Sequence, residues 1–279
     1  MGVCGQGRPR FWKLSRAMNI ILFEPCEIAA TAPGRAAIEL PRADERAAHI
    51  LGVLRRQPGD VFDAGIIDGP RGKGTLAAIG TDFLTLTFSW EEAGPPPLAP
   101  ITLVIGMPRP QTARKILCEA TALGVSEMHF VATGRGEPSY ARSTLWTGGE
   151  HRRRLVAGAA QAFCTRLPRI TFSDTLAGAV AGLAAARPGA RRVALDNYES
   201  PASLGATLPR PAAPSQATPG GGRAELILAF GAERGWTAGE RELLRAARFE
   251  FAHLGPRVLR TETAVTAAVA LALASLGLA

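Results

Sequence analysis

The sequence predicts an α/β protein whose mostly parallel sheet carries helices on both faces, preceded by a small β-rich domain. From Ile101 onward, short apolar runs alternate with longer helical patterns, which is typical of a parallel sheet. Residues 18–90 instead show short β-type runs bounded by glycine, proline and aspartate. With 279 residues, of which 47% are hydrophobic, the chain can fill the core of one large or two ordinary domains.

The segment 18–93 is expected to form the small β-rich domain. Its expected strands are Ile20–Phe23, Val61–Ala64, Gly74–Ile79 and Phe83–Phe88. One helix, from about Arg42 to Arg55, is expected to interrupt them. Residues 68–74 are expected to form a glycine-rich basic loop, and the prolines within residues 94–100 predict a stiff linker.

The segment 101–279 alternates between expected strands and helices. The strands are Ile101–Met107, Val125–Ala132, Arg192–Asp196, Glu225–Phe230 and Phe249–Leu254. The helices are Gln111–Leu123, Glu150–Thr165, Leu176–Ala186, one that opens at Thr237 and one that runs to the C-terminus. Gly124 predicts a left-handed helix end, and Thr237 with Glu240 predicts a capping box. Residues 209–222, rich in proline, alanine and glycine, predict a flexible surface loop.

The net charge of +8 favours a polyanionic partner such as nucleic acid. Half of this charge comes from residues 1–17, which contain basic residues and no acid and are expected to form a disordered basic tail. Nearly all basic residues are arginine, a skew that the base composition of a genome also produces. Charge alone therefore leaves nucleic-acid binding undecided.

The spacing of cysteine and histidine argues against metal and disulfide sites. The four cysteines contain no Cys-x-x-Cys pair, which favours a reducing cytoplasm, and the four histidines show no metal-ligand spacing. The N-terminus lacks the apolar stretch of a secretory signal. The uncharged run Thr263–Ala279 is short for a membrane span and rich in alanine, so a buried helix and no membrane partner are expected.

The most informative segment is Leu254–Ala264, which joins an apolar strand to the C-terminal helix. It places a glycine, two arginines and Thr-Glu-Thr beside a helix without charge, so these polar groups must be paired or face a ligand. A second loop, Gly231–Gly235, follows the preceding strand and also combines glycine with charge. Polar, glycine-bearing loops after neighbouring strands mark the ligand-binding edge of an open α/β sheet.

These two loops resemble the SPOUT superfamily of RNA methyltransferases, and within it the RsmE-type 16S rRNA uridine-N3 methyltransferases. The family pattern Leu-Gly-x-x-Ile-Leu-Arg-x-Glu-Thr-Ala is matched almost letter for letter at Leu254–Ala264. Its Gly-Pro-Glu-Gly-Gly is matched at Gly231, Glu233 and Gly235. The resemblance covers most of residues 18–279. It implies a trefoil-knotted domain over residues 101–279 that binds S-adenosylmethionine, a PUA-like RNA-binding β-barrel over 18–93, and a homodimer.

The resemblance also implies a cofactor site built from the two loops and the end of an earlier strand. Its expected residues are Leu195, Gly231, Ala232, Gly235, Leu254, Gly255, Val258, Leu259, Arg260 and Thr263. Arg260 and Arg135 are expected to stabilise the anion that develops on the base. Glu262, or else Glu233, is expected to orient them or take the proton. Thr263 is expected to cap the C-terminal helix.

Candidate RNA contacts are His49, Arg55, Arg71, Lys73 and Arg166. Arginine suits phosphate recognition because its planar guanidinium donates two hydrogen bonds at once. Lys73 is followed by Gly74 and not by Ser or Thr, which argues against a nucleotide-binding P-loop and leaves an RNA-contacting hairpin or a solvated turn. For His49 and Arg55, a solvated helix face with one buried histidine is an equal alternative.

Two departures from the family pattern bear on the site. Arg234 replaces a glycine, and because arginine tolerates positive φ poorly, a different loop shape is expected. Cys164 replaces an arginine expected near the target base. The leading hypothesis is an S-adenosylmethionine-dependent methyltransferase acting on N3 of a uridine in 16S rRNA of the small ribosomal subunit. The alternatives are a related enzyme with another RNA target, such as a ribose 2′-oxygen, and a ribosome-associated RNA-binding protein that has lost catalysis.

Overall fold

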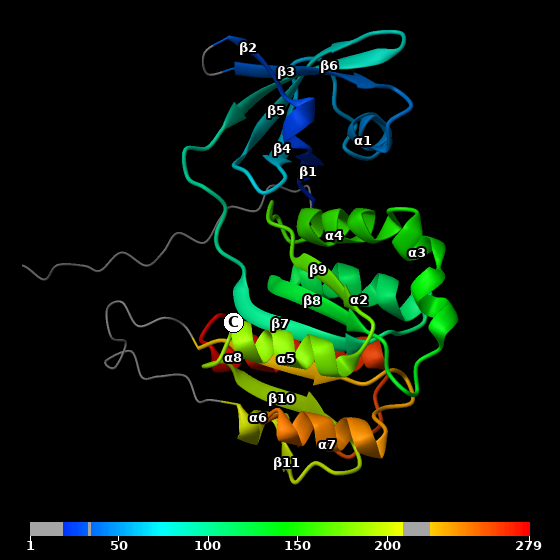
Figure 1. Cartoon of the computed structure of the whole chain (residues 1–279). Coiled ribbons are helices and arrows are strands. Elements are labelled where there is room, and N and C mark those ends of the chain that lie inside the picture. Colours follow the sequence, from blue (N-terminus) through cyan, green and yellow to red (C-terminus); the bar gives the residue numbers. More distant parts are fainter. Residues whose placement is uncertain (1–18, 33–34, 209–223) are drawn as a thin grey trace, which may run out of the picture. The chain divides into compact units, whose positions relative to one another are not determined.

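The computed structural model of the chain describes residues 19–32, 35–208 and 224–279 (Figure 1). The expected basic tail and the expected surface loop at 209–222 lie outside these residues. The described residues divide into two compact units. The first ends at Glu92, and the second takes Ala93–Ala279 together with Ile67–Pro70.

The first unit is built on a mixed six-stranded sheet with the strand order β1-β4-β5-β6-β3-β2. The strands are β1 (Ile21–Phe23), β2 (Ala29–Ala32), β3 (Arg35–Pro41), β4 (Val61–Ile66), β5 (Arg71–Ile79) and β6 (Phe83–Trp90). A short 3₁₀ turn, η1 (Pro25–Glu27), follows β1. The sheet encloses a core that includes Phe23, Leu40, Phe62 and Leu86.

Three expectations for this unit were wrong in detail. Strands β2 and β3 were missed, since their alanine-rich sequences carry weak strand signals. The expected helix is shorter, with α1 (Glu45–Ala48) continuing as a π-helical turn, η2 (His49–Val53), before Arg55 adopts a left-handed φ of 51°. The expected basic loop is partly strand, because β5 begins at Arg71. There, Gly74 lies against the ring of Phe62, which leaves no space for a side chain.

The second unit contains a seven-stranded parallel sheet with the order β11-β13-β10-β12-β7-β8-β9. Its strands are β7 (Ala99–Gly106), β8 (Val125–Val131), β9 (Arg169–Ser173), β10 (Arg191–Leu195), β11 (Ala202–Ser203), β12 (Leu226–Phe230) and β13 (Glu250–His253). Its longer helices are α2 (Pro110–Ala122), α4 (Glu150–Gln161), α5 (Leu176–Ala186), α7 (Ala238–Ala246) and α8 (Thr261–Ser275). Short elements are η3 (Pro138–Arg142), α3 (Thr144–Thr147) and α6 (Leu204–Thr207).

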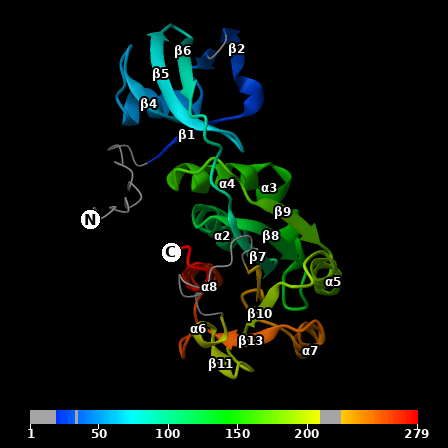
Figure 2. The same cartoon turned by 90° about the vertical axis from the view of Figure 1, so that its left-hand side faces the viewer.

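Helices cover both faces of this sheet, as the sequence predicted (Figure 2). One face packs against α2, α4 and α8, and the other against α5 and α7. Helix α8 carries no basic residue and buries Val265, Val269 and Leu273 in the first of these cores, which explains its apolar composition. No helix in the described part of the chain is long and apolar enough to cross a membrane.

The residues predicted to begin and end helices of the second unit are largely confirmed. Gly124 adopts a φ of 78° after α2, and Thr237 with Glu240 forms the capping box of α7. Helix α4 ends at Gln161, earlier than expected, because Phe163 turns into the left-handed region with a φ of 56°. Strand β9 was missed, and so were η3 and α3, which precede α4.

A cluster of charges joins α2 to α4. The Arg114 guanidinium donates to Glu150 from Nε at 2.8 Å and from Nη2 at 2.9 Å, and Arg154 donates to the same carboxylate at 2.7 Å. These hydrogen bonds lower the pKa of Glu150 from 4.5 to about 2. A depressed carboxyl pKa stabilises the fold above the unfolded-state value and loses that effect as the pH falls through the folded-state value.

We therefore expect Glu150→Gln to lower the urea midpoint of unfolding slightly at neutral pH, because the pair is solvent-screened. The difference from the wild type should shrink between about pH 4.5 and pH 2, where the wild-type carboxylate becomes protonated. Urea unfolding followed by circular dichroism over this pH range measures the effect. A difference in urea midpoint that stays constant across this pH range would contradict the lowered pKa of Glu150.

Candidate functional site

A cavity of about 170 Å³ opens at the carboxyl ends of β10, β12 and β13. Three loops contribute to its lining: residues 196–198 after β10, residues 231–235 after β12, and Leu254, Val258 and Leu259 of the segment after β13. Helix α8 adds Thr261 and Ala264. Because parallel strands direct their carboxyl ends to one edge of the sheet, segments that are distant in sequence meet there.

The loop after β12 is a tight turn tied to the neighbouring strand. The Gly235 N–H donates to the carbonyl of Ala232 at 2.7 Å, and Gly235 takes the left-handed φ of 70° that this turn requires. Trp236, fully buried, donates from Nε1 to the carbonyl of Leu195 at 3.1 Å. The positive φ falls on Gly235 and not on Arg234, so the arginine fits this turn without backbone strain.

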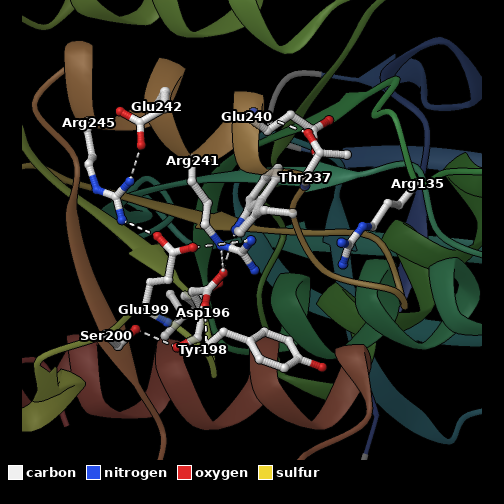
Figure 3. Close-up of polar contacts among 12 residues, drawn as sticks. Arg135, Asp196, Tyr198, Glu199, Ser200, Thr237, Glu240, Arg241, Glu242 and Arg245 are labelled. Carbon is white, nitrogen blue, oxygen red and sulfur yellow. Dashed lines mark hydrogen bonds and ion pairs between the residues drawn. The ribbon is translucent and has the colours of Figure 1, made fainter.

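The loop after β10 is organised by the buried carboxylate of Asp196 (Figure 3). Its Oδ1 accepts the backbone N–H groups of Tyr198 at 2.6 Å and Glu199 at 2.9 Å. Its Oδ2 accepts the Nε–H of Arg241 from α7 at 2.7 Å. Arg241 is 6% exposed and its guanidinium also lies 5.6 Å from the centre of the Tyr198 ring. One buried ion pair therefore fixes the backbone that forms one wall of the cavity.

Sequence reasoning missed Asp196 and Arg241 as a pair. An acidic residue directly after a parallel strand was the available signal, because that position lies at the ligand-binding edge. Its partner on α7 is 45 residues away in sequence, so only the folded chain shows the contact.

The structure brings most of the expected cofactor residues to the cavity. Those that line it are Leu195, Gly231, Ala232, Gly235, Leu254, Val258 and Leu259. Gly255, Arg260 and Thr263 are not among the lining residues. The expectation that Thr263 caps the helix was wrong, because α8 begins at Thr261 and Arg260 occupies the capping position without a side-chain cap.

The expected catalytic residues fall into two groups. Glu233 lines the first cavity and also an adjoining polar cavity of about 290 Å³, which Arg135 lines as well. Arg135 donates to the carbonyl of Arg234 at 2.8 Å, and the backbone N–H of Arg109 donates to Glu233 at 2.8 Å. Arg260 and Glu262 line neither cavity.

Glu262 forms a contact with α2 instead. Its carboxylate accepts from Nζ of Lys115 at 3.1 Å. Burial raises the pKa of Glu262, but its own backbone N–H, Lys115 and Arg260 together outweigh burial and hold the pKa below its ordinary value. Glu233 lines both cavities and Glu262 lines neither, so the geometry favours Glu233 over Glu262 as the carboxylate near a bound base.

The expected RNA contacts are distributed over both units. His49, Arg55, Arg71 and Lys73 belong to the first unit, where Lys73 pairs with Asp63 and Arg71 lies 3.9 Å from Glu91. Arg166 belongs to the second unit and donates to the carbonyl of Pro95 at 3.3 Å. Within the described residues, no group of three or more histidine, cysteine, aspartate or glutamate side chains is placed to hold a metal ion.

Comparison with known proteins adds independent findings. A family model described as RNA methyltransferase domain matches residues 95–273. The chain is 35% identical over 260 residues to the ribosomal RNA small subunit methyltransferase E of Treponema pallidum, covering 92% of this chain and 91% of that protein. It is 32% identical over 228 residues to the protein of the same name from Synechocystis, covering 78% and 67% of the two chains.

Solved structures share the fold. A ribosomal RNA small subunit methyltransferase E from Neisseria gonorrhoeae, bound to S-adenosyl methionine, superimposes with a TM-score of 0.67 at 18% identity, covering 91% of this chain and 97% of that one. A methyltransferase from Legionella pneumophila in complex with the same cofactor gives a TM-score of 0.71 at 20% identity and the same coverage. At these identities the superpositions establish the architecture of the chain.

Proposed function

Because the chain belongs to the ribosomal RNA small subunit methyltransferase E family, we propose that it transfers a methyl group from S-adenosylmethionine to N3 of a uridine in 16S rRNA. The observation that carries this proposal is the cavity at the carboxyl ends of β10, β12 and β13. The family-like segments Gly231–Gly235 and Leu254–Ala264 both contribute to its walls.

The residues around this cavity fit S-adenosylmethionine. Apolar side chains of Leu195, Leu254 and Leu259 suit the adenosyl group, and the carboxylate of Glu233 suits a positively charged ligand. When bound, S-adenosylmethionine supplies an electrophilic methyl group on a sulfonium. Gly231 packs against the backbone of Gly235, where a side chain would lie 2.8 Å away, and Gly235 has open space beside it that leaves the loop backbone accessible to the ligand.

The protein's main contribution is to position the two reactants, since methyl transfer is an in-line displacement that needs no covalent help. The adjoining polar cavity is the place for the uracil ring, because it shares Glu233 and Arg234 with the cofactor cavity. There Arg135 stabilises negative charge on the ring, and Glu233 accepts or orients the N3 proton. Arg260 lines neither cavity, although its neighbours Leu259 and Thr261 line the cofactor cavity.

This assignment predicts unequal effects for two carboxylates. Glu233→Gln should lower kcat by about 10²-fold, the lower end of what a positioned acid or base contributes. Glu262→Gln should leave kcat within about threefold of the wild type, because Glu262 contacts Lys115 outside both cavities. Steady-state methylation of small ribosomal subunits measures both. The reverse order of effects would move the catalytic role to Glu262.

Further features of the family are part of the proposal. A knot is supported by the position of β13, which lies between β10 and β11 although it follows both in sequence. The curled mixed sheet of the first unit supports a PUA-like RNA-binding barrel over residues 18–93, with His49, Arg55, Arg71 and Lys73 as contacts and 94–100 as linker. Arg166 adds a contact from the domain over 101–279. The protein acts as a cytoplasmic homodimer in this proposal, with the apolar helix α8 at the subunit contact.

Calorimetric titration of S-adenosylmethionine tests the cofactor site. The wild type should bind one molecule per chain, and Ala264→Leu, which narrows the cavity, should weaken binding at least tenfold. Gly239→Ala serves as control, because the new methyl group on the exposed start of α7 meets no atom within 4 Å. If the folded wild type did not bind S-adenosylmethionine, the proposed methyltransferase activity would be wrong and an RNA-binding function would remain.

A further inference from the structure

A second, more apolar cavity of about 320 Å³ lies in the same unit, at the carboxyl ends of β7, β8 and β9. Three aromatic residues line it: Phe130, Trp146 and Phe172. The ring of Trp146 lies 4.8 Å from that of Phe130 and 5.2 Å from that of Phe172, the latter at 78°, between centroids. Phe172 is 51% exposed, so part of its ring is accessible to a ligand. This cavity has the walls that a planar aromatic ring requires.

Two polar atoms of the lining residues have unused hydrogen-bonding capacity. Trp146 Nε1 and Thr133 Oγ1 are buried and have no hydrogen-bond partner within the described part of the chain. Buried polar groups are nearly always paired, so each such atom calls for a partner that the chain itself does not supply. A ligand with polar edges and flat faces would supply one.

The three cavities form a row along one edge of the sheet. The polar cavity shares Glu233 and Arg234 with the proposed cofactor cavity. At its other side it shares Gly136 and Glu137 with the aromatic cavity. Two arginines, Arg109 and Arg135, line this middle cavity and offer positive charge to a polyanionic strand.

We propose that the aromatic cavity binds a nucleobase next to the target nucleotide in a single-stranded RNA segment. This inference rests on the proposed function, which puts the target uracil in the middle cavity. Single-stranded RNA is recognised by stacking splayed bases on aromatic side chains, and the aromatic walls here provide that surface. The lining carboxylates of Glu137 and Asp174 accept hydrogen bonds, so the cavity favours a base with an exocyclic amino group, which offers two N–H donors, over uracil, whose edge offers N3–H alone.

The test uses the full chain and a single-stranded RNA oligonucleotide with a central uridine. 2-Aminopurine replaces one base at a time on either side of the uridine, and its fluorescence reports stacking. Ala141→Phe fills the cavity from an exposed lining position, and Phe172→Ala removes one wall. The matched control is Ala185→Phe, which places the same side chain on an exposed part of α5 away from the cavity lining.

We expect quenching at one flanking position in the wild type and in Ala185→Phe. Both cavity variants should lose this quenching and bind the oligonucleotide about tenfold more weakly, with unchanged affinity for S-adenosylmethionine. Equal quenching in Ala141→Phe, no quenching at any position of the bound oligonucleotide, or no binding of it by the wild type would each overturn the inference. Failure of the proposed function is recognised separately, as a wild type that binds no S-adenosylmethionine and methylates no ribosomal subunit.

Discussion

Replacing Asp196 by alanine is expected to destabilise the protein by about 3–5 kcal/mol, because the buried guanidinium of Arg241 loses its partner at 2.7 Å and keeps only the Glu199 carboxylate at 3.6 Å. The same change should weaken S-adenosylmethionine binding at least tenfold. Asp196 holds the backbone of Tyr198 and Glu199, and this loop forms one wall of the cofactor cavity. Urea unfolding and calorimetric titration measure the two effects.

A double replacement separates the effect of the unpaired Arg241 charge on stability from the effect of the lost loop hydrogen bonds on cofactor binding. Asp196→Ala combined with Arg241→Met removes both members of the buried pair, so part of the lost stability should return. Cofactor binding should stay weak, because the loop after β10 still lacks its organising carboxylate. As a matched control, Glu242→Gln disrupts the exposed pair with Arg245 and should change neither quantity measurably. If Asp196→Ala were as stable as the wild type, the pair with Arg241 would not stabilise the fold, and if it bound the cofactor as tightly, Asp196 would not organise this loop.

Gly106→Ala is expected to have the second large effect. A methyl group at Gly106, the last residue of β7, would lie 2.5 Å from the backbone nitrogen of Ala232 and 3.0 Å from the carbonyl carbon of Gly231. Because both contacts are with backbone, the loop after β12 must move. We expect a loss of about 1–3 kcal/mol of stability and at least a tenfold loss of cofactor affinity.

Gly239→Ala is the control for this change as well. Its methyl group meets open space on α7, so stability should stay the same or rise by up to about 1 kcal/mol. Thermal unfolding and calorimetric titration of both variants make the comparison. Unchanged cofactor affinity in Gly106→Ala would show that the loop after β12 does not shape the binding site.

Local sequence signals predicted the elements that depend on local chemistry. Helix α5 was predicted at Leu176–Ala186, and the capping box of Thr237 and Glu240 was also predicted. Both signals depend only on residues that are close in the sequence. Strands β2 and β3 were missed because alanine-rich segments are held in a sheet by their partners and not by propensity. The insertion of β13 between β10 and β11 is likewise a property of the whole chain.

The candidate site was likewise predicted only where it depends on residues close in the sequence. The two loops were identified by their motif, and residues such as Gly231 and Leu254 do line the cavity. The position of Arg260 outside the cavity could not be read from the motif, since it depends on where α8 begins. The Asp196–Arg241 pair and the row of cavities join segments far apart in sequence, and no local pattern encodes their proximity.

The most direct test is to identify the atom that the protein methylates. Small ribosomal subunits without the modification would be incubated with the full chain and S-adenosylmethionine carrying a deuterated methyl group, and the nucleosides of 16S rRNA would then be analysed by mass spectrometry. We expect labelled 3-methyluridine at a single site, with its yield strongly reduced in Glu233→Gln. Label on a ribose oxygen or on another base would contradict it, as would the absence of label with a protein that binds the cofactor.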